Sequence, residues 1–447
     1  MSASSPGDLS LLGDLLARAR AAGAEAADAV LFGGTSLSVS RRGGVTEQLE
    51  RSEDRDLGLR VFVDGRAAVV SATAVDPAGF ARLAERAVAM ARLVPPDRFA
   101  GLAEDWQPPA AAAPEMDDGE EPGAASLIAR AQAAEDAARA VPGVTNSEGA
   151  EAGFSRRTVA LATSAGFAGQ YSRSGHSVSA TALAGTGTDM QRDYDYHSTV
   201  FLSDLDDPET IGHSAGHRAV QRLRPVRAET TRLPVVFDPR VAGGLLGHLA
   251  GAINGAAVAR GTSFLKDCMG QRVLPAGLDV TDDPGRPRSL RSKPFDAEGV
   301  PTRARTVVAD GVLQSWLLDS RSARQLGLRS TGHAVRGTGG PPSPSPSNLW
   351  MTPGVLSPGG LMEDIRLGLY VTELLGQGVN GLTGDYSRGA AGFMIRDGEI
   401  AEPVAEVTIA GNLREMFLHL TPANDLRFRR GTDAPTLRVE DMMLAGA

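Results

Sequence analysis

His248 is the residue of this chain whose surroundings most resemble a metal site. It lies in an apolar, Ala- and Gly-rich run, residues 245–260, that is typical of a buried helix. In a zinc peptidase, a glutamate directly after the first histidine activates water, and a second histidine about one turn later is a further ligand. Here Leu249 follows His248, and Ala252 and Ile253 lie one turn farther on. None of these three side chains binds a metal or transfers a proton, so the run predicts the packing of a metal site without its chemistry.

A pair of histidines elsewhere in the chain has metal-like spacing. His213 and His217 lie four residues apart on one face of a predicted helix, with Glu209 a further turn back. Ser214 stands where a zinc peptidase has its glutamate, and the neighbouring residues are those of an exposed helix face. The pattern favours two solvated histidines. A hydrolase whose metal is bound by His213, His217 and Glu209 remains open as an alternative function.

The densest polar run of the C-terminal half is residues 383–389. It contains Asp385, Tyr386, Ser387 and Arg388, which are candidates for lining a peptide groove. Two interpretations stay open. In the first, Asp385 and Arg388 form an internal salt bridge that braces a Gly-rich turn. In the second, the glycines admit another backbone, so that an extended peptide adds as an edge strand beside the flat face of Tyr386.

The single cysteine, Cys268, limits the metal and redox chemistry of the chain. One cysteine excludes an internal disulfide and a multi-thiolate metal site, and it favours a reducing compartment. The N-terminus lacks a basic-then-apolar signal, and no apolar run is long enough to cross a bilayer. We therefore expect a soluble, cytoplasmic protein without membrane contact. The net charge of −9 argues against a nucleic-acid partner.

The elements that must position these residues form an α+β fold of two domains, residues 1–225 and 226–447. The first domain mixes helices with antiparallel strands, and the second is β-rich around the helix that carries His248. Residues 337–347, rich in Pro, Gly and Ser, are predicted to be an exposed or functional loop. Glu373 is placed on the last predicted helix. Helices are predicted at residues 9–22, 76–94, 124–140, 207–223, 245–260 and 361–375, and hairpins pair 37–40 with 47–50 and 58–63 with 67–70.

Several longer motifs resemble one known family, the TldD/PmbA family, formerly called modulators of DNA gyrase. The resemblance spans most of the chain and is to the PmbA (TldE) branch. Its motifs lie at residues 57–65, 245–250, 260–267, 317–327, 340–348, 368–374, 383–393 and 407–412.

The resemblance implies a division of labour between two subunits. In that family the TldD subunit carries a His-Glu-x-x-x-His zinc motif and a late cysteine, whereas the PmbA-type subunit lacks the metal ligands. Here His248 is kept at the first-ligand position, Leu249 and Ile253 replace the glutamate and the second histidine, and no cysteine follows Cys268. Two histidines five residues apart are poorly placed to bind one ion from a single helix. An ideal helix turns about 500° over five residues, so the two imidazoles diverge unless the helix widens.

Two principal hypotheses follow from the resemblance and from the residues. In the first, the chain has no catalytic residue of its own and is one subunit of a TldD–TldE heterodimer, a zinc metallopeptidase that acts on unfolded peptides, with zinc in the TldD-type partner. In the second, it is a stand-alone peptide-binding or regulatory homodimer without hydrolytic activity.

Overall fold

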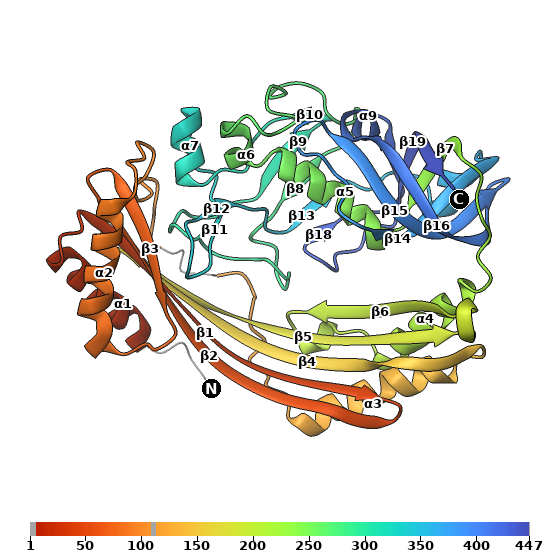
Figure 1. The fold of residues 1–447 in the computed structure, drawn as a ribbon, viewed down its shortest axis with the longest axis horizontal. Coiled ribbons are helices and arrows are strands. Elements are labelled where there is room, and N and C mark those ends of the chain that lie inside the picture. Colours follow the sequence, from red (N-terminus) through yellow and green to blue (C-terminus); the bar gives the residue numbers. More distant parts are fainter. Residues whose placement is uncertain (1–5, 109–112, 447) are drawn as a thin grey trace.

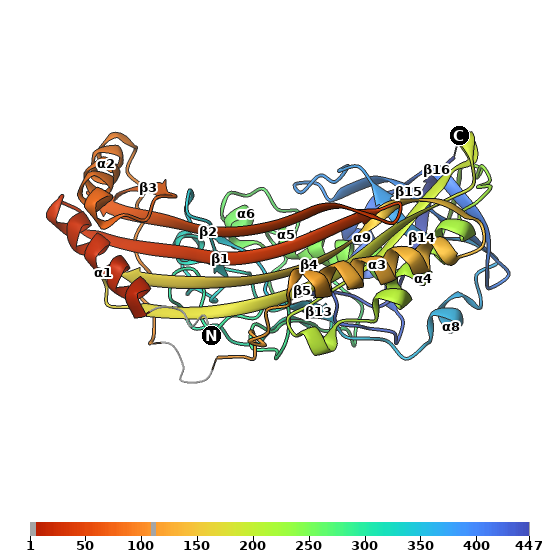
Figure 2. The same ribbon diagram turned by 90° about the horizontal axis from the view of Figure 1, so that it is seen from below.

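The structure, a computed structural model, describes residues 6–108 and 113–446 and confirms the mixed α+β fold. A long, curved antiparallel sheet runs the length of the molecule, and the C-terminal half lies over one of its faces (Figures 1 and 2). The strands of this sheet follow the order β3-β2-β1-β4-β5-β6. Their bounds are β1 Ala26–Arg42, β2 Val45–Val63, β3 Arg66–Ala72, β4 Val144–Thr163, β5 Ala168–Ala184 and β6 Gln191–Thr199.

Four helices cover the other face of the sheet. Because side chains alternate across a strand, one set of apolar residues on β1, such as Leu31 and Leu37, faces the helices. The fourth helix begins as predicted, with Asp207 accepting a hydrogen bond from Glu209 N and Pro208 in the first turn. The helices are α1 Pro6–Ala21, α2 Phe80–Leu93, α3 Ala124–Ala140 and α4 Pro208–Gln221.

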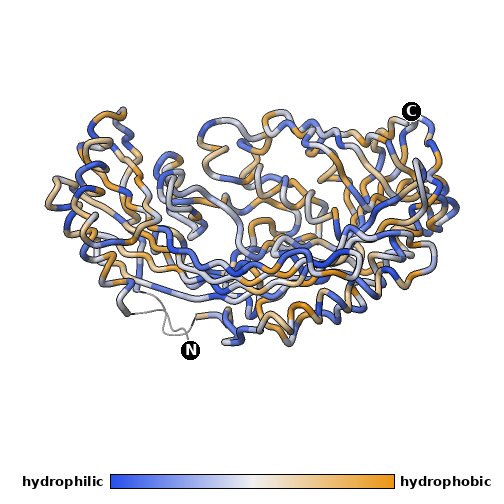
Figure 3. The backbone as a smooth tube through the Cα atoms, turned by 60° about the horizontal axis from the view of Figure 1, so that its bottom comes forward, coloured by the Kyte–Doolittle hydropathy of each residue, from blue (hydrophilic) through white to orange (hydrophobic). Residues whose placement is uncertain are grey.

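The alternate residues of the sheet contact the C-terminal half. Val30 and Phe32 on β1 and Leu161 on β4 pack against Phe295. Figure 3 shows apolar residues interspersed with polar ones along these strands. Because Leu31 packs against the helices and its neighbour Val30 packs against Phe295, both faces of the sheet are used for packing. The long sheet therefore positions the C-terminal half as well as the four helices.

The C-terminal half contains a sheet that closes on itself and a second, smaller sheet. In the first, the order is β16-β15-β14-β7-β19-β17, and β16 also pairs with β19. The second has the order β10-β9-β8-β13-β18, and β11 pairs with β12. The strands are β7 Thr231–Phe237, β8 Val280–Asp282, β9 Arg305–Ala309, β10 Val312–Leu313, β11 Ala334–Val335, β12 Ser343–Pro344, β13 Leu349–Met351, β14 Leu367–Leu375, β15 Asp385–Arg396, β16 Glu399–Asn412, β17 Leu420–Pro422, β18 Thr432–Asp433 and β19 Leu437–Ala445.

The helices of this half are short, and two of the predicted helices differ from those in the structure. The predicted helix at 361–375 is wrong: α8 ends at Met362 and strand β14 follows, so Glu373 lies on a strand and pairs with Arg222 at 2.5 Å. The predicted helix at 245–260 is interrupted after Ala252. The helices are α5 Pro239–Ala252, α6 Gly255–Ala259, α7 Ser320–Leu326, α8 Pro358–Met362 and α9 Leu413–Leu418. Within the described residues, none is long and apolar enough to cross a membrane.

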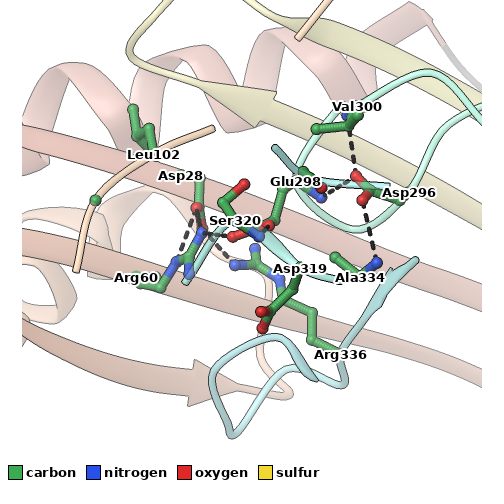
Figure 4. Close-up of polar contacts among 12 residues, drawn as sticks. Asp28, Arg60, Leu102, Asp296, Glu298, Val300, Asp319, Ser320, Ala334 and Arg336 are labelled. Carbon is green, nitrogen blue, oxygen red and sulfur yellow. Dashed lines mark hydrogen bonds and ion pairs between the residues drawn. The ribbon is translucent and has the colours of Figure 1, made fainter. Parts of the chain in front are cut away.

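A buried ionic network joins the long sheet to the C-terminal half (Figure 4). Asp28 on β1 lies opposite Arg60 on β2 and accepts a 2.9 Å hydrogen bond from its Nε, while Arg336 Nη1 donates to the other carboxylate oxygen. Arg60 also pairs with Glu298 at 3.4 Å, and Glu298 accepts a 2.8 Å hydrogen bond from Ser320 N. Burial alone would raise the pKa of Asp28, but Arg336 and Arg60 outweigh it and hold that pKa below its ordinary value.

The Pro-, Gly- and Ser-rich loop 337–347 packs against the same region. Thr338 Oγ1 donates a 2.5 Å hydrogen bond to Asp56 Oδ2 on β2. A Cβ at Gly58 would lie 2.7 Å from the carbonyl oxygen of Thr338, so only glycine permits this approach. Thr338 is therefore buried in the junction, whereas Gly337 and Gly339 on either side of it are exposed, as predicted for the loop.

Asp28→Asn tests whether the junction depends on this network. The substitution leaves Arg60 and Arg336 buried without their shared counter-charge, and removing one partner of a buried ion pair costs roughly 3–5 kcal/mol. We expect a loss of that size in the free energy of unfolding, measured by urea denaturation followed by circular dichroism. Glu53→Gln is the control, because its partner Arg51 is exposed and such pairs contribute less than about 1 kcal/mol. Equal losses in the two variants would contradict the assignment.

Candidate functional site at the His248 helix

Helix α5, which carries His248, is fixed at both ends. Asp238 caps its start by accepting a 2.8 Å hydrogen bond from Arg240 N, and Pro239 occupies the first turn. Asn254 ends the helical run and caps α6 through the backbone N–H groups of Ala256 and Ala257. The apolar side of α5 lies in the main core of the C-terminal half. The position of the His248 imidazole is therefore set by the packing of the whole helix.

The imidazole of His248 is half-buried beside β15. Its ring meets the ring of Tyr386 edge to face, with centroids 5.9 Å apart and an interplanar angle of 78°. Burial lowers the pKa of His248, and the positive charge of Arg388 lowers it further. A neutral imidazole is therefore the favoured form at neutral pH.

Of the four polar candidates on β15, Tyr386 and Arg388 lie beside His248. Side chains alternate along a strand, so the other two, Asp385 and Ser387, are on the opposite face, where both are exposed. Tyr386 is 1% exposed and its hydroxyl has no hydrogen-bond partner. Burial, partly opposed by Arg388, raises the pKa of Tyr386 to about 12. The site therefore presents an imidazole, a buried phenol and a guanidinium.

The salt bridge considered between Asp385 and Arg388 is not formed. Asp385 accepts hydrogen bonds from Thr383 Oγ1 at 2.6 Å and from Asn412 Nδ2 at 3.2 Å. Arg388 Nε donates to the carbonyl of Leu375 at 3.1 Å. The physical reason is the strand itself, because residues three apart in a strand point to opposite faces.

The start of β15 offers no free backbone edge for an added peptide strand. One side of β15 pairs with β16, where Tyr386 is opposite Gly411. On the other side, Tyr386 bridges to Val379, and Ser387 N donates a 2.7 Å hydrogen bond to Gly378 O. Strand addition beside Tyr386, one of the two interpretations left open, is therefore excluded at this point, because the protein's own segment 377–380 occupies the position. Only side chains are left there for contact with another molecule.

The two positions that differ from a zinc motif are filled with buried aliphatic side chains. Leu249 is 1% exposed and Ile253 is fully buried, and both belong to the main core. Ile253 is the first residue beyond α5, and its N–H still donates a 2.9 Å hydrogen bond to Leu249 O. Within residues 6–108 and 113–446, no group of three or more His, Cys, Asp or Glu side chains is arranged to hold a metal. The residues around His248 do not fit a zinc ion.

The remaining sequence candidates lie apart from this site. His213 and His217 are exposed on α4. Cys268 is partly buried in a turn, where its N–H donates to Leu265 O at 2.8 Å. Glu373 lies near the C-terminal end of β14, where it is paired with Arg222. What the sequence did not reveal is which residues of the run 385–388 face His248, because nothing local indicates how β15 packs on α5.

Known proteins with this fold and these motifs identify the family. The chain matches models of three PmbA/TldA metallopeptidase domains: domain 1 at residues 27–91, the central domain at 117–223 and the C-terminal domain at 230–446. These matches span most of the chain, which therefore belongs to the PmbA/TldD family.

Individual relatives agree with the family models. The chain is 40% identical to the metalloprotease PmbA of Escherichia coli O157:H7 over 419 residues, which is 92% of this chain and 90% of the relative. It is 34% identical to the metalloprotease PmbA homolog of Haemophilus influenzae, with the same coverage of both chains. The fold is that of the crystal structure of TldE from Thermococcus kodakarensis, with a TM-score of 0.87 at 20% identity, covering 98% of this chain and 100% of that one.

Arg388→Gln tests the electrostatics of the site. Removing the guanidinium removes a charge that disfavours the imidazolium, so the pKa of His248 should rise toward its ordinary value. The measurement is a pH titration of the His248 ring protons by NMR, with the signal assigned through a His248→Gln spectrum. Asp385→Asn is the control, since this carboxylate lies on the opposite face and should leave the titration unchanged. An unchanged or lower pKa in Arg388→Gln would refute the proximity of the two charges.

Proposed function

We propose that this chain is the PmbA/TldE-type subunit of a two-component zinc metallopeptidase that acts on unfolded peptides in the cytoplasm. In this arrangement the TldD-type partner holds the zinc ion, which polarises the attacking water and the peptide carbonyl. The chain described here contributes no metal ligand and no general base. Its part is to pack against the partner and to shape the space in which the peptide lies.

The observation that carries this proposal is the pair of buried aliphatic residues beside His248. A catalytic zinc ion normally has three protein ligands and an open position for water. His248 is one imidazole, and Leu249 and Ile253 are part of the core. An ion placed there would have to displace well-packed side chains and would leave most of its coordination unfilled.

The charge beside His248 supports the same proposal. Arg388 lies close enough to lower the pKa of His248, which means that it disfavours positive charge on the imidazole. A divalent cation at the same nitrogen meets the same repulsion. Tyr386 and Arg388 are instead suited to contact a neutral or anionic part of a peptide, through an aromatic face and through guanidinium donors.

Reconstitution tests the proposal directly. We expect the pure chain to leave an unstructured peptide intact, and a mixture with its TldD-like homologue to co-elute as one species and cleave the peptide. Cleavage by the pure chain that resists chelators would overturn the proposal. A homodimer that binds the peptide and stays inactive with the homologue would support the stand-alone binding protein instead.

His248→Ala in the reconstituted pair separates a packing role from a ligand role. Losing even an outer partner of a metal ligand costs roughly 10–100-fold in metal affinity or activity, and losing a true zinc ligand costs more. We expect the pair carrying His248→Ala to keep peptide-cleavage activity within about tenfold of the unmodified pair. The matched control replaces the first metal-motif histidine of the partner, which should abolish cleavage. Equal losses for the two substitutions would show that His248 is a ligand.

A further inference from the structure

A cavity of about 390 Å³ lies at the junction between the long sheet and the C-terminal half. Ligand pockets in proteins range from roughly 300 to 1,000 Å³, so the volume is that of a small-molecule site. One wall is apolar and is formed by Val30 and Phe32 of β1 together with Val159 and Leu161 of β4. The polar part of the wall comes from β5, which contributes Arg173, and from the C-terminal half, which contributes Arg291, Lys293, Asp296 and Arg336. The cavity is therefore amphiphilic.

The polar wall carries more positive than negative charge. Arg173, Arg291 and Lys293 line it, and none of the three forms an ion pair with a carboxylate in the part of the chain that the structure describes. Arg173 donates to the carbonyls of Leu290 and Ser292, and Arg291 Nη1 donates to Thr432 Oγ1. These are neutral acceptors. Three cations, of which Arg173 and Lys293 are partly buried and Arg291 is exposed, thus share one cavity without a paired counter-charge among the described residues.

Lys293 is the most informative of these cations. The sequence contains two lysines, Lys266 and Lys293, and Lys266 is exposed. The ammonium of Lys293 has one long hydrogen bond, 3.5 Å to Ala334 O. Burial lowers the pKa of Lys293 although Asp296 and Asp282 oppose the effect. An anion inside the cavity would supply the missing interaction.

Two further groups in the cavity wall have unused donors. Arg336 is committed to Asp28 through Nη1, but its buried Nε and Nη2 have no hydrogen-bond partner among the described residues. The same holds for the buried hydroxyl of Ser347. Buried donors in native proteins are nearly always satisfied, so unpaired donors that line a cavity indicate a ligand that accepts hydrogen bonds.

Asp296, the carboxylate in the cavity wall, does not neutralise these cations. Its two oxygens accept hydrogen bonds from the backbone N–H groups of Glu298 and Val300, both at 2.9 Å, and of Ala334, at 3.1 Å (Figure 4). Burial and Glu298, opposed by Lys293, raise the pKa of Asp296 to about 7. It is therefore largely occupied by backbone donors and only partly ionised near neutral pH.

We propose that this cavity binds an organic monocarboxylate that carries a compact apolar group. The carboxylate lies against Lys293, Arg173 and the free nitrogens of Arg336, and the apolar group lies against the β1 and β4 wall. A carboxylate fits because it is a planar acceptor that guanidinium groups bind in parallel, while the apolar wall selects against a simple inorganic anion. The same chemistry is offered by a free short-chain acid and by the last residue of a peptide.

Isothermal titration calorimetry on the full chain at low ionic strength tests the proposal. We expect N-acetyl-leucine to bind saturably, and its neutral isostere N-acetyl-leucinamide to bind at least about tenfold more weakly, because an amide leaves the cations unpaired. Inorganic phosphate should also be at least about tenfold weaker, since it gains nothing from the apolar wall. No saturable binding of N-acetyl-leucine, or equal binding of the amide or of phosphate, would overturn the proposal.

Lys293→Met locates the binding within the chain. The substitution keeps an unbranched side chain of similar size and removes its charge, so affinity for N-acetyl-leucine should fall at least about tenfold. Lys266→Met is the matched control and should bind as the unmodified chain does. Thermal melting checks that both variants are folded. If Lys293→Met does not fold, Arg173→Gln takes its place and should lower the affinity for N-acetyl-leucine in the same way. Unchanged affinity in the folded variant would place the ligand elsewhere and overturn the assignment.

Two more ligands identify the source of the carboxylate. If acetyl-Ala-Ala-Ala-Leu as the free acid binds at least as tightly as N-acetyl-leucine, the natural ligand is a peptide C-terminus. If hexanoate binds and the peptide acid does not, it is a free acid. Either result supports the shared chemistry. These titrations use the isolated chain, so they succeed or fail independently of peptide cleavage by the reconstituted pair.

Discussion

The buried charge balance around Asp28 is the interaction on which the arrangement of the molecule depends. One carboxylate on the long sheet is shared by Arg60 from the neighbouring strand and by Arg336 from the C-terminal half. Burying these charges is costly unless each is paired, so the sheet and the C-terminal half are stable together in one relative position. Glu298 extends the network from Arg60 to the start of α7. The apolar contacts of Phe295 add area to the junction, but the ion pairs fix its register.

The molecule has two sites of different character. At the junction, the cavity beside Arg336 holds more cations than carboxylates and has unused donors. At α5, the imidazole of His248 meets the ring of the buried Tyr386 and experiences the charge of Arg388, with aliphatic side chains in place of further ligands. Both environments disfavour a bound cation and favour neutral or anionic groups. In the proposed complex, the chain would therefore act on the peptide through recognition, while the metal chemistry belongs to the partner.

The sequence predicted local elements well where a local signal existed. The helix at 124–140 has the predicted bounds, and the Asp64-Gly65 turn joins β2 to β3 as expected. The segment 361–375 was predicted wrongly because its apolar residues fall in a helix-like rhythm. Its second part is an inner strand, paired with β15 on one edge and β7 on the other, and consecutive residues on both of its faces are buried, so it shows no simple alternation. Pairing with distant strands determined its structure, and no local pattern records that.

The candidate site was predictable in part. The family motif directed attention to His248 and to residues 385–388, and the structure brings Tyr386 and Arg388 of that run to the imidazole. The junction escaped sequence reasoning because its charged residues come from segments far apart in the chain and none has a local motif. Arg336 and Lys293 are informative only once the fold shows what lies beside them.

In the proposed two-subunit peptidase, this chain holds no catalytic ion of its own. The most direct measurement is anomalous X-ray diffraction at the zinc absorption edge on crystals of the chain with its TldD-like partner. We expect a strong anomalous peak at the histidine motif of the partner and none at the imidazole of His248. An anomalous peak within bonding distance of His248 would contradict it.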